Sequence, residues 1–185
     1  HVARHHHVLG CGAALDKAVP IVHGVDERTA IGRPGFREKH GISKTGRLFI
    51  SAGGFGKHKR MLELARAFGE SRTGPEDRLV LFGYQKPTED GDAYLDACDA
   101  VDGVKTVLGA SRDEVLDALA EADVYVMNSE WEGFGLVLLE SMLNGCPWIA
   151  NVGAGAAGDL SCLGQTYDDD LGLKRLIEDA PPRSE

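Results

Sequence analysis

The sequence lacks the features that would assign it at once to a membrane or a nucleic-acid-binding class. Among its 185 residues no apolar run approaches the roughly 20 residues of a membrane-spanning helix, and no signal-peptide pattern opens the chain. Basic residues are also fewer than acidic ones, so the formal net charge is −9. That balance excludes a broad electrostatic attraction to nucleic acid or to an anionic membrane. We therefore expect a cytoplasmic protein with no nucleic-acid partner.

Cysteine is scarce, and its four copies are scattered with no Cys-x-x-Cys pair. This distribution is typical of reduced thiols in a cytosolic protein rather than of a disulfide framework or a zinc site. Histidines cluster at the N-terminus and could bind a metal, but such a cluster is more often a solvated or tag-derived segment. We therefore predict no metal site. The residues concerned are Cys11, Cys98, Cys146 and Cys162, with His1, His5, His6 and His7.

What the chain does contain is an alternation of short apolar runs with helix-like stretches. Its length and its 43% hydrophobic residues support one large domain. Strands that are apolar on both faces, separated by helices, predict an α/β fold: a Rossmann-like parallel sheet with helices on both faces. Strands are predicted at 47–54, 78–83, 104–109, 123–129, 148–153 and 163–167, and helices at 60–70, 93–101, 135–145, 170–179 and after the capping residue Ser111.

The first 46 residues differ from the rest of the chain. They are rich in glycine, proline and histidine and contain one apolar stretch, from Val19 to Val25. We interpret residues 1–46 as a connecting segment that leads into a single Rossmann-like α/β domain at 47–185.

Glycines follow several predicted strands, at the edge of a parallel sheet where ligands bind. The segment "GGFGKHKR" (53–60) joins the first strand to its helix. Gly53 and Gly54 allow the backbone to approach a ligand, and a helix N-terminus attracts anions. Lys57, Lys59 and Arg60 add positive charge, so a phosphate or diphosphate fits. Taken alone, the segment is better explained as an ordinary turn with solvated basic residues, and it matches neither a Walker loop nor Gly-x-Gly-x-x-Gly.

A second segment, "SEWEGFGLVLLESM" (129–142), places two carboxylates in apolar company. Glu132 precedes the Gly133-Phe134-Gly135 turn, which opens a second helix N-terminus. Glu140 lies inside a helix that is apolar nearly all round, and such a helix is expected to be buried. A buried carboxylate needs hydrogen-bond donors. Sugar hydroxyls are suitable donors; in the alternative, Glu132 is solvated and Glu140 pairs with a lysine or arginine.

Together these segments resemble the retaining GT-B glycosyltransferases, family four in particular. "EGFGLVLLE" resembles the Glu-x7-Glu signature, and "ISAGGFGKHKRMLELARAF" the Gly-Arg-x-x-x-x-Lys-Gly segment. "VPIVHGVD" resembles the Val-Ile-Pro-Asn-Gly-Val-Asp linker. "ADVYVMNSEWEGFG" and "GCPWIANVGAGAAGDL" resemble the runs before and after the glutamate motif. The resemblance covers roughly residues 19 to 178, and five linked motifs in family order make it specific.

The resemblance implies a role for each matching residue. Lys59 would bind the donor diphosphate, Glu140 the nucleotide ribose and Glu132 the transferred sugar. The backbone of Phe134, Gly135 and Leu136 would cover the sugar and phosphates. The loops after Gly83 and around Leu108 would hold the base, largely by backbone. The donor would be a UDP-, GDP- or ADP-sugar, with neither a cofactor nor a metal, because lysine and a helix terminus replace the metal electrostatically.

Three departures from the family pattern stand out. Gly54 occupies the place of the phosphate-binding arginine, so either Lys57 or Arg60 compensates or the diphosphate is held more weakly. Ala157-Gly158-Asp159 stands where a Pro-Glu pair is common. The N-terminal Rossmann-like domain, which supplies the acceptor site in GT-B enzymes, has no counterpart here.

These features predict the donor-binding domain of a retaining hexosyltransferase, incomplete and inactive alone, with the N-terminal domain as its missing partner. Peripheral attachment of the complete enzyme to a membrane stays open. The alternatives are a non-catalytic nucleotide-sugar-binding module, or a sugar-nucleotide epimerase or phosphorylase of the same architecture.

Overall fold

A single parallel sheet forms the centre of the molecule. The computed structural model describes residues 24–84 and 91–183. Six strands lie in the order β3-β2-β1-β4-β5-β6, and every pair of neighbours is parallel. This confirms the predicted Rossmann-like α/β fold. The strands are β1 (Leu48–Gly53), β2 (Arg78–Gly83), β3 (Val104–Leu108), β4 (Val124–Met127), β5 (Trp148–Asn151) and β6 (Gln165–Tyr167).

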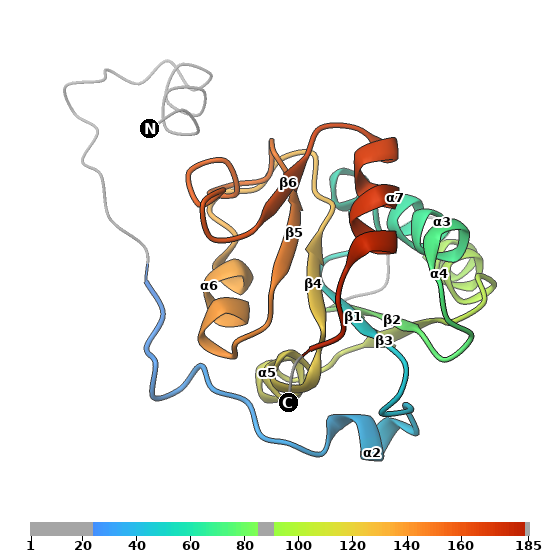
Figure 1. The fold of residues 1–185 in the computed structure, drawn as a ribbon, viewed down its shortest axis with the longest axis horizontal. Coiled ribbons are helices and arrows are strands. Elements are labelled where there is room, and N and C mark those ends of the chain that lie inside the picture. Colours follow the sequence, from blue (N-terminus) through green and yellow to red (C-terminus); the bar gives the residue numbers. More distant parts are fainter. Residues whose placement is uncertain (1–23, 85–90, 184–185) are drawn as a thin grey trace.

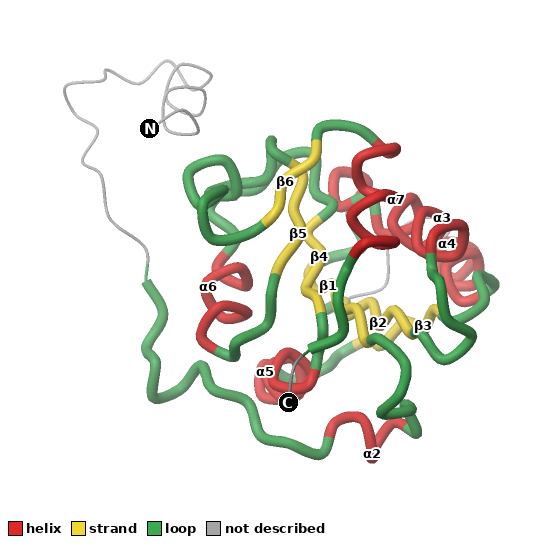
Figure 2. Tube along the Cα trace, viewed as in Figure 1, coloured by secondary structure: helices red, strands yellow, loops and turns green. Residues whose placement is uncertain are grey.

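Helices cover both faces of this sheet (Figure 1). On one face lie α3 (Met61–Ser71), α4 (Gly91–Asp99) and α7 (Asp170–Asp179). On the other lie α2 (Phe36–His40), α5 (Arg112–Glu121) and α6 (Leu136–Leu143). The same view coloured by secondary structure sets the strands of the sheet apart from the helices that cover it (Figure 2). Among the described helices none is both long and apolar enough to cross a membrane.

Each face of the sheet has its own hydrophobic core, because side chains alternate along a strand. In β1, Leu48 and Ile50 point into the core beneath α5 and α6. Phe49, between them, points into the core beneath α3 and α7. Strand β4 divides its residues in the same way, with Tyr125 in the first core and Val126 in the second. The strands are therefore buried on both sides, as their continuous apolar runs indicate.

Helix α2 lies inside the segment that the sequence presents as a connection. Gly35 and Gly41 flank it with positive φ angles of 118° and 65°, a conformation that favours glycine. Phe36 joins the core beneath α5, and Arg37 is also buried. Residues 24–46 thus pack on the domain. The predicted boundary at residue 46 stays a prediction, and the short helix is a feature that the sequence analysis missed.

Candidate functional site

The carboxyl edge of the sheet gathers the residues singled out from the sequence. Gly53 ends β1 and is in register with Gly83 at the end of β2, which in turn is in register with Leu108 at the end of β3. The Gly109 N–H donates to the Gly83 carbonyl over 2.8 Å, which fixes the loop that follows Leu108. Three strand ends therefore form one row, as expected for a ligand-binding edge of a parallel sheet.

Lys59 and Glu132 meet at this edge. Lys59 belongs to the short 3-10 helix η2 (Lys57–Lys59) after β1, and its Nζ donates to Glu132 Oε2. Ser129 Oγ donates to the same oxygen over 3.4 Å. Both charged side chains are mostly covered, with 15% and 23% of their surfaces exposed. The predicted anion-binding turn and the predicted glutamate motif, far apart in sequence, are thus parts of one constellation.

Two further contacts join the same loops. The Glu130 N–H donates to the His58 carbonyl over 2.8 Å. The rings of His58 and Trp131 stack at 4.3 Å with an interplanar angle of 16°. Trp131 keeps 62% of its surface exposed. The backbone bond and the ring contact, both made by residues just before Lys59 and Glu132, therefore tie together the two loops that carry the pair.

Arg60 closes the η2 turn in a strained backbone conformation. Its φ of 50° makes it the one non-glycine residue with positive φ among the described residues. Asn128 Nδ2 donates to the Arg60 carbonyl over 2.9 Å, and the Tyr167 hydroxyl donates to Asn128 Oδ1 over 2.6 Å. The Arg60 guanidinium donates to Asp170 in α7 over 2.7 Å. These bonds fix the residue directly after Lys59. They also engage Arg60 with α7, which leaves the exposed Lys57 as the other residue expected to replace the family arginine.

Gly54 itself is not required by packing. A Cβ atom built there would have no neighbour closer than 4.0 Å, and Gly54 is absent from the residues of positive φ. The position therefore has room for a side chain that the sequence does not supply.

The glycine turn after β4 presents an uncapped helix start. Gly135 has a φ of 82° and precedes α6 without any side-chain cap. A Cβ atom there would lie 2.9 Å from Met127 Cε, at the end of a flexible side chain, so it is the backbone angle that requires glycine. The Phe134 carbonyl accepts from the Ala156 N–H over 3.0 Å, and a Cβ at Gly133 would meet nothing within 4 Å. The first N–H groups of α6 can thus face an anion.

The environment of Glu140 corrects one expectation and matches one of the alternatives left open for this residue. Helix α6 is not buried all round: Leu138, Glu140 and Ser141 are buried, whereas Leu136 and Leu143 are 40% and 37% exposed. Glu140 also has a protein partner, because Arg112 Nε and Nη2 donate to its Oε1 over 3.0 and 2.8 Å. The composition of α6 predicted burial because the helix is almost entirely apolar. The helix covers the edge of one core, and no neighbour among the described residues fully covers its outer face.

Tyr125, in β4, belongs to the core beneath α5 and α6. Its pKa is raised well above the ordinary value, first by complete burial and then by the negative charges of Glu132 and Glu140. Its hydroxyl donates to the Ala52 carbonyl over 3.5 Å. Tyr125 therefore stays protonated as a neutral hydroxyl.

Arg112 and Tyr125 are the residues that the sequence analysis missed here. Arg112 follows the helix-capping Ser111, whose hydroxyl accepts from the Glu114 N–H, so its place near the carboxyl edge could have been inferred from the strand-helix order. Tyr125 carried no signal, because a tyrosine in an apolar strand is ordinary core.

No group of three or more potential metal ligands occurs in the part of the chain that the structure describes. The N-terminal histidines lie outside the described residues, so the predicted absence of a metal stays a prediction.

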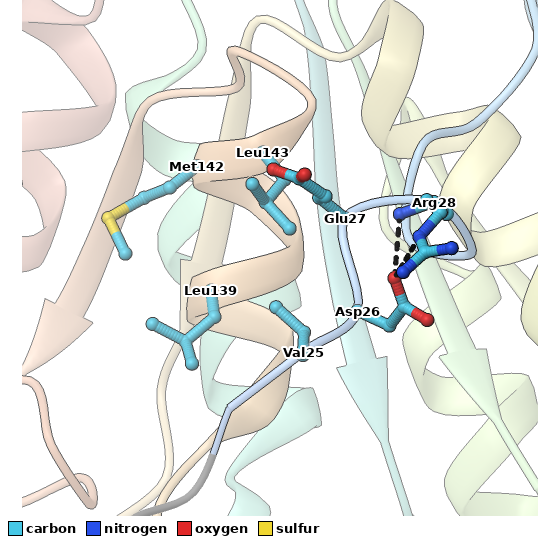
Figure 3. A pocket seen from close by; sticks show the side chains of 7 residues that line it. All are labelled: Val25, Asp26, Glu27, Arg28, Leu139, Met142 and Leu143. Carbon is cyan, nitrogen blue, oxygen red and sulfur yellow. Dashed lines mark hydrogen bonds and ion pairs between the residues drawn. The ribbon is translucent and has the colours of Figure 1, made fainter.

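A separate hollow of about 530 Å³ lies on the outer side of α6 (Figure 3). It is lined by residues 25–28, which run alongside the helix, and by Leu139, Met142 and Leu143. None of the predicted site residues lines it, so it is distinct from the carboxyl-edge constellation.

Known proteins are similar to this chain in sequence and in fold. The chain is 30% identical over 135 residues to N-acetyl-alpha-D-glucosaminyl L-malate synthase of Bacillus anthracis, a match that covers 70% of this chain and 34% of that protein. Anabaena Alr3699/HepE in complex with UDP-glucose has a TM-score of 0.76 at 21% identity, over 91% of this chain and 49% of that one. Sucrose-phosphate synthase (tll1590) from Thermosynechococcus elongatus has a TM-score of 0.73 at 22% identity, over 96% and 48%. The chain thus spans about a third to a half of the length of these proteins.

The family model for glycosyl transferases group 1 matches residues 32–166. That range includes both strand-to-helix turns, the Lys59–Glu132 pair and Glu140. The sheet corresponds to one Rossmann-like half of the GT-B neighbours. The chain belongs to the glycosyl transferases group 1 family.

Proposed function

We propose that this chain is the donor-binding domain of a retaining glycosyltransferase that transfers a hexose from a nucleotide-diphosphate sugar to a hydroxyl acceptor. The observation that carries the proposal is the meeting of Lys59 and Glu132, 73 residues apart in sequence, beside the uncapped start of α6. A cation, a carboxylate and free backbone donors there provide for both the phosphates and the sugar of such a donor.

The diphosphate would lie between η2 and the start of α6. Lysine carries three donors, so Lys59 Nζ can keep Glu132 and still bind phosphate oxygens. The helix terminus adds a partial positive charge. Gly53 would give the backbone close access, since the nearest atoms to a Cβ there are those of the Lys59 side chain, from 3.6 Å. Gly54 would leave the phosphate grip without an arginine.

The two glutamates would bind hydroxyl groups on either side of the diphosphate. Glu132 would contact the transferred sugar beside Gly133 and Phe134. Glu140 would hold the ribose, and the row from Gly53 to Leu108 would receive the base through its backbone. One solved neighbour is described as a complex with UDP-glucose, which supports UDP as the first nucleotide to test. No cofactor or metal is needed for these roles.

The domain would act by positioning and by stabilising the leaving group rather than through a nucleophile of its own. The bond between the anomeric carbon and the diphosphate oxygen breaks, and a bond to the acceptor oxygen forms on the same face of the sugar. Lys59 and the α6 terminus would stabilise the negative charge that collects on the released diphosphate. The acceptor proton leaves with that diphosphate or with solvent.

The remaining part of the enzyme would be an N-terminal acceptor-binding Rossmann domain. We expect the 185-residue chain to bind the donor nucleotide and to transfer little or no sugar by itself. Detectable sugar transfer by the purified chain would contradict this part of the proposal.

Calorimetric titration with UDP, GDP and ADP tests the donor site. We expect one nucleotide to bind selectively and Glu140→Ala to weaken that binding. Glu130→Ala is the matched control, because Glu130 is an exposed carboxylate on the same loop as Glu132. Absence of binding to all three nucleotides, or equal loss in the control, would overturn the proposed site.

A further inference from the structure

Arg112 engages Glu140 in an asymmetric way. Its Nε and Nη2 both donate to Oε1, instead of dividing between the two oxygens as a parallel bidentate pair does. Glu140 is 8% exposed, whereas half of the Arg112 side chain faces solvent. The carboxylate is thus held from one side by a cation that remains accessible.

The guanidinium is also anchored to the segment that precedes α2. Arg112 Nη1 donates to the Thr29 carbonyl over 2.9 Å. The next residues are fixed to the C-terminal end of α6, because Asn144 Nδ2 donates to the Ala30 carbonyl over 2.7 Å and Asn144 Oδ1 accepts from the Gly32 N–H over 2.8 Å. Arg112 therefore has a defined position set by three elements, and the position of Oε1 follows from it.

We propose that Arg112 is a positioning residue for ribose recognition. By occupying Oε1, it presents Oε2 of Glu140 to the ribose hydroxyls and so sets the preference of the domain for ribonucleotides over deoxyribonucleotides. The inference rests on the proposed donor site, within which Glu140 binds the ribose. It adds that the selectivity belongs to the Arg112–Glu140 pair and not to the carboxylate alone.

The selectivity has a physical basis in the fixed carboxylate. A buried acceptor that is held in place loses a hydrogen bond when the ligand lacks the matching hydroxyl, and it cannot turn to find another. Without Arg112 the Glu140 side chain can rotate toward solvent or toward other donors. The loss of the hydroxyl then costs less, and the two kinds of nucleotide become more alike.

The test compares UDP with 2′-deoxy-UDP on the full chain by calorimetry, or the corresponding GDP or ADP pair if one of those is the nucleotide that binds. We expect the wild type to prefer the ribonucleotide by about tenfold or more. In Arg112→Ala the ribonucleotide should bind more weakly while the deoxyribonucleotide changes little, so the ratio falls to a few-fold. Arg112→Lys should restore part of the ratio, because a single cation still reaches Oε1.

Arg33→Ala is the matched control. Arg33 is exposed and, together with Arg112, lines a second hollow, different from that of Figure 3. Its hydrogen bond to Asp117 uses the backbone N–H, so the substitution removes charge without removing that bond. We expect its ratio to equal that of the wild type. Thermal unfolding of each variant confirms that folded protein is compared.

Each outcome decides between the inferences. Equal weakening of both nucleotides in Arg112→Ala, or an unchanged ratio, would overturn the role of Arg112 while leaving the donor site intact. Failure of the wild type to bind any ribonucleotide would overturn the donor site itself, and the inference with it. A reduced ratio in Arg33→Ala as well would assign the effect to general charge and would also overturn the proposal.

Discussion

The amino and carboxyl edges of the sheet hold their charged side chains differently. Before β1 and β4, at the amino edge, Arg47 pairs with Asp77 and Arg37 pairs with Asp123, and no side chain in these pairs is more than 10% exposed. Arg47 also donates to the carbonyls of Ile177 and Ala180, each over 2.9 Å. At the carboxyl edge, Arg112 is half exposed and both of its bonds to Glu140 go to one oxygen.

This difference separates charges that stabilise the fold from charges that remain able to bind. A buried ion pair whose donors and acceptors are all used has no capacity left for a ligand, and breaking it is expensive. A partly covered pair with unused donors or oxygens is a poor stabilising device but a suitable binding one. The two edges can therefore be told apart by substitution.

The largest expected effect is on stability at the amino edge. Asp123 accepts from Arg37 over 2.6 Å and also from the Leu48 and Arg183 backbone N–H groups. Asp123→Ala leaves a buried guanidinium without its partner, so we expect a loss of about 3–5 kcal/mol in the free energy of unfolding. Urea denaturation measures it. Asp168→Ala, at an exposed position, should stay within about 0.5 kcal/mol of the wild type; similar losses in the two variants would erase the distinction.

At the carboxyl edge we expect a large effect on ligand binding and a small effect on stability. Lys59→Ala should weaken binding of the nucleotide diphosphate by about tenfold to a hundredfold, because a bond from a charged donor is lost. Its stability should change less than that of Asp123→Ala, because Glu132 keeps some access to solvent and the Ser129 hydroxyl as a donor. Calorimetry and urea denaturation on the same preparations give both numbers. Lys57→Ala removes an exposed lysine from the same turn and should have the smaller effect on affinity. A large fall in stability with Lys59→Ala would instead mean that the Lys59–Glu132 pair stabilises the fold, as the amino-edge pairs do.

A gain of affinity would sharpen the comparison. Gly54→Arg adds the side chain for which the position has room and for which the family pattern has an arginine. Because arginine can bind phosphate oxygens through two donors, we expect the nucleotide diphosphate to bind about tenfold more tightly. Gly54→Ala controls for the loss of backbone freedom. Unchanged affinity in Gly54→Arg, measured by the same calorimetry, would show that the edge is not limited by the missing cation.

The fold was predictable because its signals are local. Continuous apolar runs ending in glycine marked the strands, and strand β2 and helix α7 occupy the predicted ranges. Helix α2 was missed because "FREKH" is short and mostly polar, and its stability comes from Phe36 packing on a core built from distant segments.

The site was predictable in its parts and not in its pairings. The two turns and the two glutamates could be found because glycine and buried carboxylate are unusual in apolar surroundings. That Lys59 bonds Glu132, and that Arg112 bonds Glu140, depends on strand order and on side-chain angles, which no local pattern contains. Sequence reasoning therefore left ligand and arginine as alternatives for Glu140, and the structure supplies the arginine.

A pH dependence follows from the second buried pair of the amino edge. Burial acts to raise the pKa of Asp77, but the hydrogen bonds from Arg47 and from the Gly74 N–H outweigh it, and the net pKa lies below the ordinary value. A lowered folded-state pKa contributes stability that is fully present above the unfolded pKa of about 4 and is lost as pH falls through the folded one. We expect the stability difference between wild type and Asp77→Asn to narrow as pH falls from 6 toward 3, as measured by urea unfolding at each pH. A constant difference would contradict the assignment.

The smallest expected effect concerns backbone strain at Arg60, which also lies at the carboxyl edge. Arg60 has a left-handed conformation that costs a residue with a Cβ about 1 kcal/mol or more relative to glycine, and it is tolerated because Asn128 holds its carbonyl and Asp170 its guanidinium. Arg60→Ala loses the ion pair and keeps the strain, whereas Arg60→Gly loses both. We therefore expect the glycine variant to be the more stable of the two by about 1 kcal/mol in urea unfolding. Because both variants lack the Arg60 side chain, the difference in their stability isolates the backbone effect. An alanine variant as stable as the glycine variant would mean that the turn after Lys59 relaxes and does not hold the lysine in place.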